Sequence, residues 1–509
     1  MMTYLLFFSC HAVMTFAFRA AAPRAALDST IPGDAGTPVA ICCTIADDLV
    51  EATIESCFRL DHPNVSVFLC DDSFDPTTRA RVDALAANRD CCFVVRRTDR
   101  ASFKAGNLNN LLRIIGDGYR YLLLVDNDSI IAPDFIRTAL LCFERDPSLA
   151  FVQACHRASE PPDATPFQRS MALSVAAAWR CASVKNRFGI PLMLGHGALL
   201  SLERLREAGG FPDRVAEDLA LTVRLRELGH RGAVVEIWCE EGVPPTFTQY
   251  RRQFEKWIIG LCEFLRRDFR SLASSRIPAS ERFDIVLGAL TLLNGVMLLA
   301  FIAVTNVVWP LAAGDRHTIL LGGGALRMPV LQLSLFQQWH PAAGVRIAIV
   351  TATIASLVFF LPDLRHSPWR TLRHISNGFV CVCGMLVPAF VAVVLCCTTG
   401  RYAFRVTGRA EGGRWRRGLA ANLHVGRGLS LIIEIAAGAG GIAMALLTWN
   451  MFLASIASGI LLAPFLDVLG WNRTLLIGLR HLPFLLLCIQ LFFLAMPSGF
   501  IPGGMFIMM

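Results

Sequence analysis

The sequence predicts an α/β domain with a mostly parallel sheet, joined to an α-helical membrane domain. Residues 30–275 mix charged segments with short apolar runs, whereas long apolar stretches dominate from residue 284 onward. These stretches are near the ~20 residues that a bilayer-crossing helix needs. The 509-residue chain is 54% hydrophobic with a mean hydropathy of +0.50, which is too apolar for a soluble enzyme.

At the N-terminus, residues 2–18 form a short apolar run followed by Arg19 and Arg24. This predicts a spanning helix whose C-terminal end lies in the cytoplasm. A cleaved signal peptide is the alternative, although the run lacks a basic leading region. We expect a transmembrane helix at 1–28 and a globular domain at 29–275 that ends in an interfacial helix.

Four apolar, β-rich runs follow in the globular domain. They are VAICCTI at 39–45, VSVFLCDD at 65–72, CFVVRR at 92–97 and YLLLVDND at 121–128, and helical patterns occupy 47–59 and 106–115. Strands that alternate with helices at this spacing indicate a doubly wound parallel sheet. Ligands of such sheets bind beyond the carboxyl ends of the strands, which is where two acidic clusters fall.

The last part, 276–509, is expected to be a transmembrane channel domain. Its candidate spans are 285–308, 346–362, 377–398, 429–447, 452–470 and 482–500. If 377–398 crossed the bilayer, the arginine-rich stretch 401–427 would lie outside, against the positive-inside tendency. We therefore predict that the segment 363–398 lies at the interface or re-enters, and that 399–428 is a cytoplasmic loop.

The charge and the cysteines support this arrangement. The net charge of +8 is carried almost wholly by arginine, as in a positive-inside membrane protein, and does not indicate a nucleic-acid partner. The 17 cysteines are scattered without metal-ligand spacing, which fits a reduced, cytoplasm-facing domain. The only lysines, Lys104, Lys185 and Lys256, stand out in so arginine-rich a chain.

The acidic clusters suit a nucleoside diphosphate. Asp126 and Asp128 alternate with Asn127, so their carboxylates can flank one hard cation, Mg²⁺ or Mn²⁺, that neutralises a pyrophosphate. Asp71 and Asp72 end the strand at 65–72, where a carboxylate can accept a hydrogen bond from a base imide or a ribose hydroxyl. Two acidic strand ends are a stronger indication than one, which can be a simple helix cap.

Two helix starts add further candidates. Lys104 precedes the helix at 106–115, and an ammonium at a helix start suits phosphate oxygens, although a solvated lysine is the simpler interpretation. Glu217 and Asp218 begin an amphipathic helix, where acids commonly complement the helix dipole. A carboxylate here could also act as a general base that takes a proton from a hydroxyl, and Asp218 is the best candidate.

The ordered motifs resemble those of the processive family 2 glycosyltransferases, the group that includes cellulose, hyaluronan, curdlan and poly-N-acetylglucosamine synthases. The motifs are DDS at 71–73, KAGN at 104–107, DND at 126–128, ED at 217–218 and QFEKW at 253–257. The similarity is strong over residues 38–270 and continues through FRVTGR at 404–409. It implies a GT-A-like nucleotide-sugar-binding fold, the α/β class that the strand pattern predicts.

The resemblance implies a role for each donor-site residue. Asp71 or Asp72 would contact the uridine of a UDP-sugar, and Lys104 the diphosphate. Asp126 and Asp128 would hold the nucleotide and its Mg²⁺ or Mn²⁺.

It also implies the catalytic and acceptor residues. Asp218, beside Glu217, would be the general base. Gln253, Lys256 and Trp257 would correspond to the family's Gln-x-x-Arg-Trp signature, in which the basic residue holds the diphosphate and the tryptophan stacks on the acceptor sugar.

Four further residues match family positions. FRVTGR resembles a gating loop in which Thr407 and Arg409 would reach over the loaded nucleotide, although a basic juxtamembrane loop also explains the arginines. His196, in GHGALL, would lie beside the acceptor or be structural, and Gln153 matches a glutamine near the active site.

The chain departs from the family pattern in places. Lys256 replaces the signature arginine with Glu255 beside it, Ala216 precedes the Glu-Asp pair, and Ile45-Ala46-Asp47 replaces an early motif that carries an aromatic. A point charge replaces a bidentate fork, so the diphosphate geometry is expected to differ. These departures concern which sugar is transferred and whether transfer is processive.

Taken together, these features predict a multi-pass protein of the bacterial inner membrane with a cytoplasmic catalytic domain. It would transfer sugar from a UDP-sugar to a growing β-linked polysaccharide and export the product, with accessory export subunits an open question. The alternatives are a non-processive transferase acting on a membrane lipid and a nucleotide-regulated transporter. Apart from Glu434, ionisable residues are sparse in the apolar stretches, which disfavours a transporter.

Overall fold

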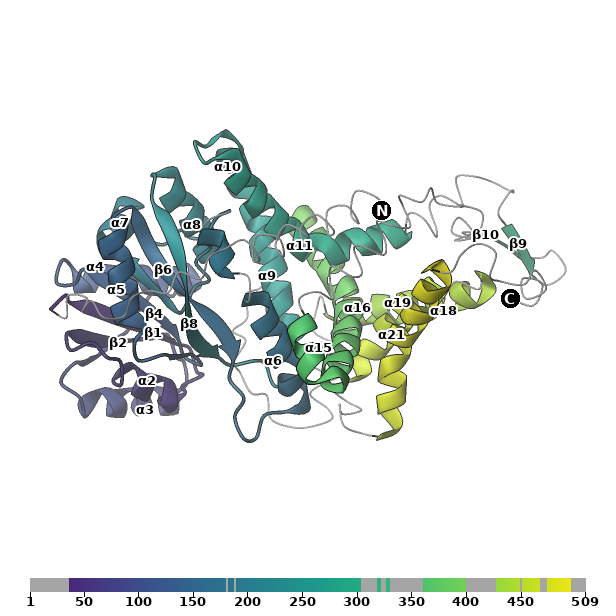
Figure 1. The fold of residues 1–509 in the computed structure, drawn as a ribbon, viewed down its shortest axis with the longest axis horizontal. Helices are drawn as coiled ribbons and strands as arrows, with labels where there is room; N and C mark the ends of the chain where they lie inside the picture. The colour runs from purple at the N-terminus through teal and green to yellow at the C-terminus, as the bar shows by residue number, and fades with distance from the viewer. Residues whose placement is uncertain are drawn as a thin grey trace.

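A computed structural model describes residues 36–179, 182–186, 189–303, 318–321, 326–329, 360–399, 427–448, 451–466 and 474–495. Figure 1 shows the sheet and its covering helices at one end of the molecule and the C-terminal helices at the other. The apolar run 2–18, most of the span 346–362, and Thr407 and Arg409 in the gating-like segment lie outside the described residues.

The four strands expected from the sequence form one half of the sheet. They are β1 (Val39–Ile45), β2 (Val65–Asp71), β3 (Cys92–Val95) and β4 (Tyr121–Asp126). They lie in the order β3-β2-β1-β4 and are all parallel, so the carboxyl ends of β2 and β4, with their acids, flank that of β1. The parallel arrangement predicted from the strand-helix alternation is confirmed for this half.

The other half of the eight-stranded sheet is mixed. It contains β5 (Ile130–Ile131), β6 (Leu149–Ala158), β7 (Ala198–Ser201) and β8 (Arg231–Glu241) in the order β7-β6-β8-β5. Strand β7 is antiparallel to both β4 and β6, whereas β6 and β8 are parallel. The sheet is thus mostly parallel, with β7 and β5 as the antiparallel exceptions.

Helices cover both faces of the sheet. The helices α2 (Glu51–Cys57), α3 (Pro76–Ala87) and α5 (Phe135–Arg145) pack on one face, and α4 (Phe103–Ile115), α7 (Leu202–Glu207) and α8 (Glu217–Glu227) on the other. Successive residues of a strand point to opposite faces. Accordingly, Ile41 and Cys43 belong to the first core, and Ala40 and Cys42 to the second.

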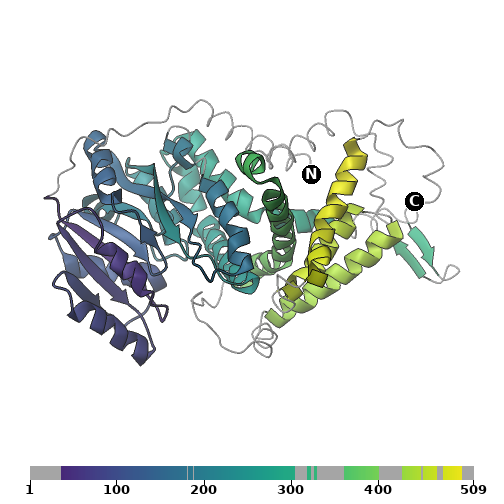
Figure 2. The same ribbon diagram turned by 60° about the horizontal axis from the view of Figure 1, so that its bottom comes forward.

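The remaining elements lie beside and beyond the sheet (Figures 1 and 2). They are α6 (Pro166–Trp179), η1 (Ala182–Asn186), α9 (Phe247–Arg267), α10 (Phe269–Ser274), α11 (Ala279–Ala303), α15 (Leu361–His366), α16 (Pro368–Thr399), α18 (Arg427–Thr448), α19 (Met451–Leu462), η4 (Ala463–Phe465) and α21 (Thr474–Ala495), with the antiparallel pair β9 (Thr318–Leu321) and β10 (Leu326–Pro329). Helix α16 lies at their centre and contacts α6, α9, α11, α18, α19 and α21.

The segment predicted to be interfacial forms most of one continuous helix, α16, with Pro388 inside it. Within the described ranges, Pro368–Thr398 is the one stretch long and apolar enough to cross a membrane, judged by length and composition alone. Shorter apolar helices occupy Ser430–Leu446, Phe452–Phe465 and Leu479–Ile489. The membrane placement of these helices stays a prediction.

Candidate active site

The end of β4 and the start of α4 bring together the first two charges of the site. Lys104 Nζ lies 2.5 Å from Asp126 Oδ1, which also accepts from Thr44 Oγ1 at 3.1 Å. Thr44 faces Asp126 because β1 and β4 are paired in register. The same ammonium donates to the Gly195 carbonyl at 3.0 Å, so Lys104 joins the strand end to the loop before β7.

Gly195 marks the point where the predicted motifs converge. Its φ is +77°, a left-handed conformation that favours glycine. A Cβ on this residue would lie 3.4 Å from Asp218 Oδ2, 3.6 Å from Lys104 Nζ and 3.9 Å from Glu217 Oε1. Residues 104, 126, 217 and 218, far apart in the sequence, therefore surround one small space.

The charges in this space perturb one another. Burial alone would lower the pKa of Lys104, but the carboxylates of Asp126, Glu217 and Asp218 outweigh it and raise the pKa above its ordinary value. Burial would raise the pKa of Asp126, yet Lys104 and then His196 hold it well below its usual range. Lys104 is therefore a permanent cation and Asp126 a permanent anion at neutral pH.

The three residues of the DND motif differ in their surroundings. Asn127 is structural, because its amide oxygen accepts from Val50 N at 3.0 Å and its amide nitrogen donates to the Asp48 carbonyl. Asp128 is exposed at the surface, but partial loss of hydration and the nearby Asp126 charge raise its pKa to about 6. Asp126 and Asp128 are therefore the two carboxylates of this turn available to a cation.

Glu217 and Asp218 start helix α8, as the sequence predicted. Burial and the adjacent Asp218 raise the pKa of Glu217 to about 7, and burial also raises the pKa of Asp218. A carboxylate whose pKa lies above its usual value is a stronger base, which suits proton removal from a hydroxyl.

Helix α9 carries the QFEKW residues and packs directly against the start of α8. A Cβ on Gly260 would lie 3.1 Å from Ala216 Cβ and 3.2 Å from its backbone nitrogen, so the two segments are in close contact. The charge of Lys256, one turn before Gly260, helps to lower the pKa of Asp126. The Trp257 ring is 43% exposed and makes an edge contact with Tyr250.

With this geometry in place, the comparisons with known proteins become informative. The model of the glycosyltransferase-like family 2 matches residues 34–260, which contain every motif of the site just described. Residues 34–260 form a family 2 glycosyltransferase domain. The transferase domain is thus the globular half, in agreement with the resemblance seen in the sequence motifs.

Curated relatives of this glycosyltransferase include polysaccharide synthases. The UDP-forming cellulose synthase catalytic subunit of Komagataeibacter sucrofermentans is 27% identical over 43% of this chain and 30% of its own length. The glucans biosynthesis glucosyltransferase H of Ralstonia nicotianae is 24% identical over 67% of this chain and 41% of its own length. The chain spans less than half the length of the curated relatives it matches.

Among solved structures, a mannosyltransferase from Pyrobaculum calidifontis in complex with GDP-Man and Mn²⁺ is similar, with a TM-score of 0.46 and 18% identity. The match covers 79% of this chain and 97% of the mannosyltransferase.

The two acids expected to contact uridine are engaged elsewhere in the glycosyltransferase. The Asp71 side chain is 0% exposed and accepts from Arg96 Nε at 2.7 Å. Asp72 pairs with Arg97, 2.7 Å from Nη2, and Arg97 also donates to the carbonyls of Ala101 and Phe103. In this state, the two aspartates brace the loop before α4.

His196, one residue after Gly195, belongs to a hydrogen-bond network that the sequence did not reveal. Its Nδ1 is 3.1 Å from Ser129 Oγ and its Nε2 is 3.3 Å from Glu241 Oε2. Gln153 supports the same loop by donating to the His196 and Gly197 carbonyls. Glu241 is the last residue of β8, and no sequence motif around it indicated a role in the site.

Proposed function

We propose that this glycosyltransferase is embedded in the bacterial inner membrane, uses a UDP-sugar, inverts the anomeric configuration, and extends a β-linked polysaccharide that it exports. One observation carries the proposal. Lys104, paired with Asp126, shares the space beside Gly195 with the Glu217–Asp218 pair. A diphosphate-binding cation and a candidate base therefore face the same point.

The carboxylates of Asp126 and Asp128 fit a divalent cation. Asp128 is exposed with a pKa raised to about 6, in part by the Asp126 charge, so a cation between them would relieve this repulsion. Bound there, Mg²⁺ or Mn²⁺ would supply charge neutralisation to the diphosphate leaving group. Lys104 and Lys256 add two fixed positive charges for the same oxygens.

Asp218 acts as the general base in this proposal. The terminal hydroxyl of the acceptor gives its proton to the Asp218 carboxylate as its oxygen attacks the anomeric carbon. The bond from that carbon to the diphosphate oxygen breaks, and UDP leaves on the opposite side. In-line attack converts the α linkage of the donor to a β linkage.

The position of α9 supports coupling to the membrane domain. Its Phe247 packs with Val380 and Met385 of α16, while its Ile258 packs with Ala389 and Ala392 of the same helix. Trp257 therefore lies on a helix that contacts both the catalytic loop and the C-terminal helices. A sugar chain stacked on its exposed ring would have a short path to those helices.

The decisive experiment is transfer by the full-length protein in nanodiscs. UDP-glucose, UDP-N-acetylglucosamine and UDP-glucuronate would each be supplied with Mg²⁺ or Mn²⁺, and UDP release measured. The radiolabelled product would then be sized and its linkage determined. A long β-linked polymer supports the proposal; a single sugar on a lipid would favour the non-processive alternative, and no release with any donor would contradict both.

A further inference from the structure

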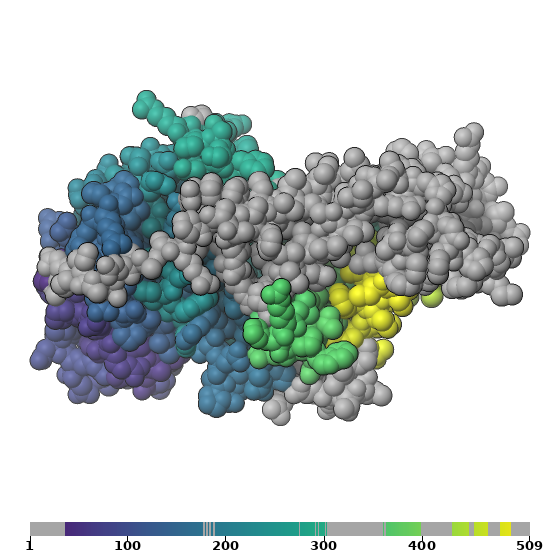
Figure 3. Space-filling model, viewed as in Figure 1, coloured from purple at the N-terminus to yellow at the C-terminus, as the bar shows by residue number. Residues whose placement is uncertain are grey.

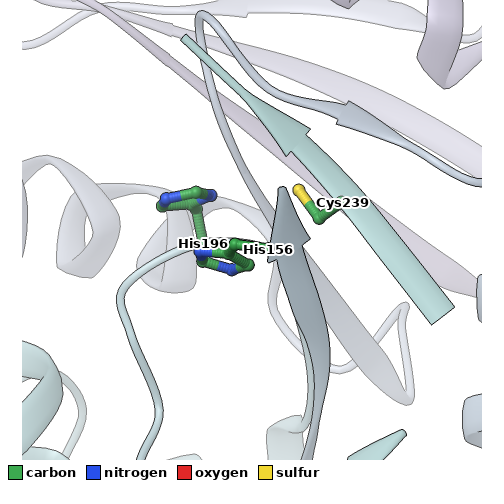
Figure 4. Close-up of side chains that lie close together, drawn as sticks. All are labelled: His156, His196 and Cys239. Carbon is green, nitrogen blue, oxygen red and sulfur yellow. The ribbon is translucent and has the colours of Figure 1, made fainter. Parts of the chain in front are cut away.

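Behind the DND turn, two imidazoles and a thiol gather in the protein interior. His156 comes from β6, His196 from the loop before β7, and Cys239 from β8. One ligand atom from each lies within 4.8 Å of the other two, and Figure 4 shows the three side chains grouped between the strands. Cys239 is 0% exposed and His156 3% exposed, so these polar side chains are buried and cannot be solvated by bulk water.

Gly197 leaves room at the centre of this cluster. Its φ is +62°, and a Cβ there would lie 3.1 Å from His156 Nε2 and 3.2 Å from Cys239 Sγ. The imidazole nitrogen and the sulfur thus border the same small volume beside the glycine. A residue with a side chain would fill the space that these two donors share.

The surrounding hydrogen bonds orient the rings as they do in metal sites. Glu241 Oε2 lies 3.1 Å from His156 Nδ1 and 3.3 Å from His196 Nε2. A carboxylate that accepts from one nitrogen of a histidine fixes the tautomer and directs the other nitrogen to a metal. For His156 that nitrogen is Nε2; for His196 it is Nδ1, whose present contact is Ser129 Oγ at 3.1 Å, so Ser129 would give up this contact when the metal binds. Gln153 Nε2 is 3.1 Å from His156 Nε2, but its two hydrogens have nearer acceptors in the carbonyls of His196 and Gly197.

The donor set differs in kind from the DND carboxylates. Two imidazole nitrogens and a thiolate are ligands that Zn²⁺ prefers, whereas Mg²⁺ and Mn²⁺ prefer carboxylate oxygens. We propose that His156, His196 and Cys239 bind a Zn²⁺ ion, with Glu241 as the carboxylate that orients both histidines. This site is separate from the nucleotide-metal site at Asp126 and Asp128.

The ion would hold the catalytic loop in place. The Gly195 carbonyl that accepts from Lys104 is one residue before His196, so a metal bond to His196 ties this loop to β6 and β8. The same bond would fix the position of Lys104 relative to Asp126. Zinc at this point would therefore have a structural role and would not contact the donor sugar or its diphosphate.

The test is metal analysis of the full-length protein, purified in detergent without added metal. We expect about one zinc per chain in the wild type and in Asp128→Asn, which alters only the hard-cation site. Cys239→Ser and His156→Asn should lose most of it, while Cys142→Ser, a half-buried cysteine on α5, should retain it as the matched control. Equal zinc in wild type and Cys239→Ser would overturn the proposal.

A second measurement needs no variant. Co²⁺ exchanged into the wild-type protein should give a thiolate-to-cobalt charge-transfer band in the near ultraviolet, because Cys239 would be a ligand. A folded wild-type protein that contains no zinc and gives no such band would show that the cluster is only hydrogen-bonded. Both readings are independent of sugar transfer, so failure of one proposal is distinguishable from failure of the other.

Discussion

The charges around Gly195 are of both signs and lie close together. Lys104 and Lys256 face the carboxylates of Asp126, Glu217 and Asp218, and the neighbouring carboxylates hold the pKa of Lys104 above its ordinary value. A diphosphate would add negative charge beside these carboxylates. Since like charges repel strongly in a partly buried site, a cation bound with the donor would offset that repulsion.

The role of Asp218 can be tested by removing its basicity without changing its shape. Asp218→Asn should lower the rate of transfer by about 10²–10⁴-fold, the usual contribution of a general base. UDP binding should be nearly unchanged, because the amide still fills the space beside Gly195. Steady-state rates and UDP titration calorimetry measure the two effects, and turnover close to the wild-type rate would remove the assignment.

Glu217 should make the stability of the ligand-free protein depend on pH. Its folded pKa of about 7 lies above the ordinary 4.5, so between these values the folded state holds a proton that the unfolded chain has lost. Stability therefore falls as the pH rises through this window. Glu217→Gln should match the wild type at pH 4.5 and exceed it by about 1–3 kcal/mol at pH 8.

Thermal unfolding without donor or metal, at both pH values, provides this comparison. Glu203→Gln, at a side chain that is 79% exposed, serves as the control and should change neither midpoint. A Glu217→Gln variant no more stable than the wild type at pH 8 would show that the carboxyl group is not strained in the folded state.

At the scale of the elements, α9 carries the proposed acceptor residue Trp257 and the proposed diphosphate-binding residue Lys256. It begins at a Thr246 cap, whose hydroxyl accepts from Gln249 N, and Glu263 near its end accepts from Val215 N at 2.8 Å. Helix α9 is therefore fixed at both ends, and Gly260 lets it approach the α8 start closely. Lys256 and Trp257 have a defined position relative to Asp218 as a result.

Trp257→Ala should shorten the polymer several-fold while leaving UDP affinity within about twofold, because the indole ring offers stacking area to the acceptor and not to the nucleotide. Trp257→Phe keeps an aromatic face and should give an intermediate length. Product sizing by gel filtration, beside UDP titration of the same samples, separates the two effects. Polymers of unchanged length in the alanine variant would exclude a stacking role.

Local sequence pattern predicted the elements whose signals are local. The run at 39–45 is buried on both faces, so its continuous apolar character marked β1 correctly, and the acids at 217–218 marked the start of α8. The convergence of Lys104 with Asp126 could be anticipated because both lie beyond the carboxyl ends of strands in the parallel half of the sheet.

Non-local partners could not be read in the same way. Strand β8 brings Cys239 and Glu241 to His156 and His196 through pairing with β6, and no spacing along the chain announces this. Likewise, the pairing of Asp71 with Arg96 depends on which strand ends meet in the folded sheet. The two acids at the end of β2 could be identified from the sequence, whereas their ion pairs with arginine side chains could not.

For the molecule as a whole, charged contacts join the transferase domain to the C-terminal helices. Arg251 of α9 pairs with Glu434 of α18 at 2.5 Å, and Ser430 donates to the same carboxylate at 2.9 Å. Glu434, 2% exposed, is the ionisable residue that stood out in the apolar stretches, and the pair accounts for it. This contact places the first two turns of α18 beside α9.

Helix α16 also stays on the catalytic side for much of its length. Its early residue His374 contacts the Ser170 carbonyl of α6, and Figure 3 shows the green patch of α15 and early α16 next to the blue of α6. Trp369, 82% exposed, belongs to this surface. Farther along, α16 packs on α9 as far as Ala392.

This packing bears on whether α16 crosses the bilayer. Helix α9 carries seven charged residues, among them Arg251, Lys256 and Arg266, and this charge disfavours a position in the hydrocarbon core. A helix that lies alongside α9 from Met385 to Ala392 must share its depth. The packing therefore favours an interfacial or re-entrant α16, although its length alone would allow it to span.

The expected consequence is that residues 401–427 face the cytoplasm. A protease site inserted between residues 411 and 414 should be cut in inside-out vesicles and protected in right-side-out vesicles, because seven arginines in that stretch favour the inner side. A matched insertion between residues 89 and 90, in the turn after α3, reports the side of the transferase domain. Cleavage of the two insertions from opposite sides would contradict the cytoplasmic placement of residues 401–427; cleavage of both from the same side would support it and the interfacial or re-entrant α16.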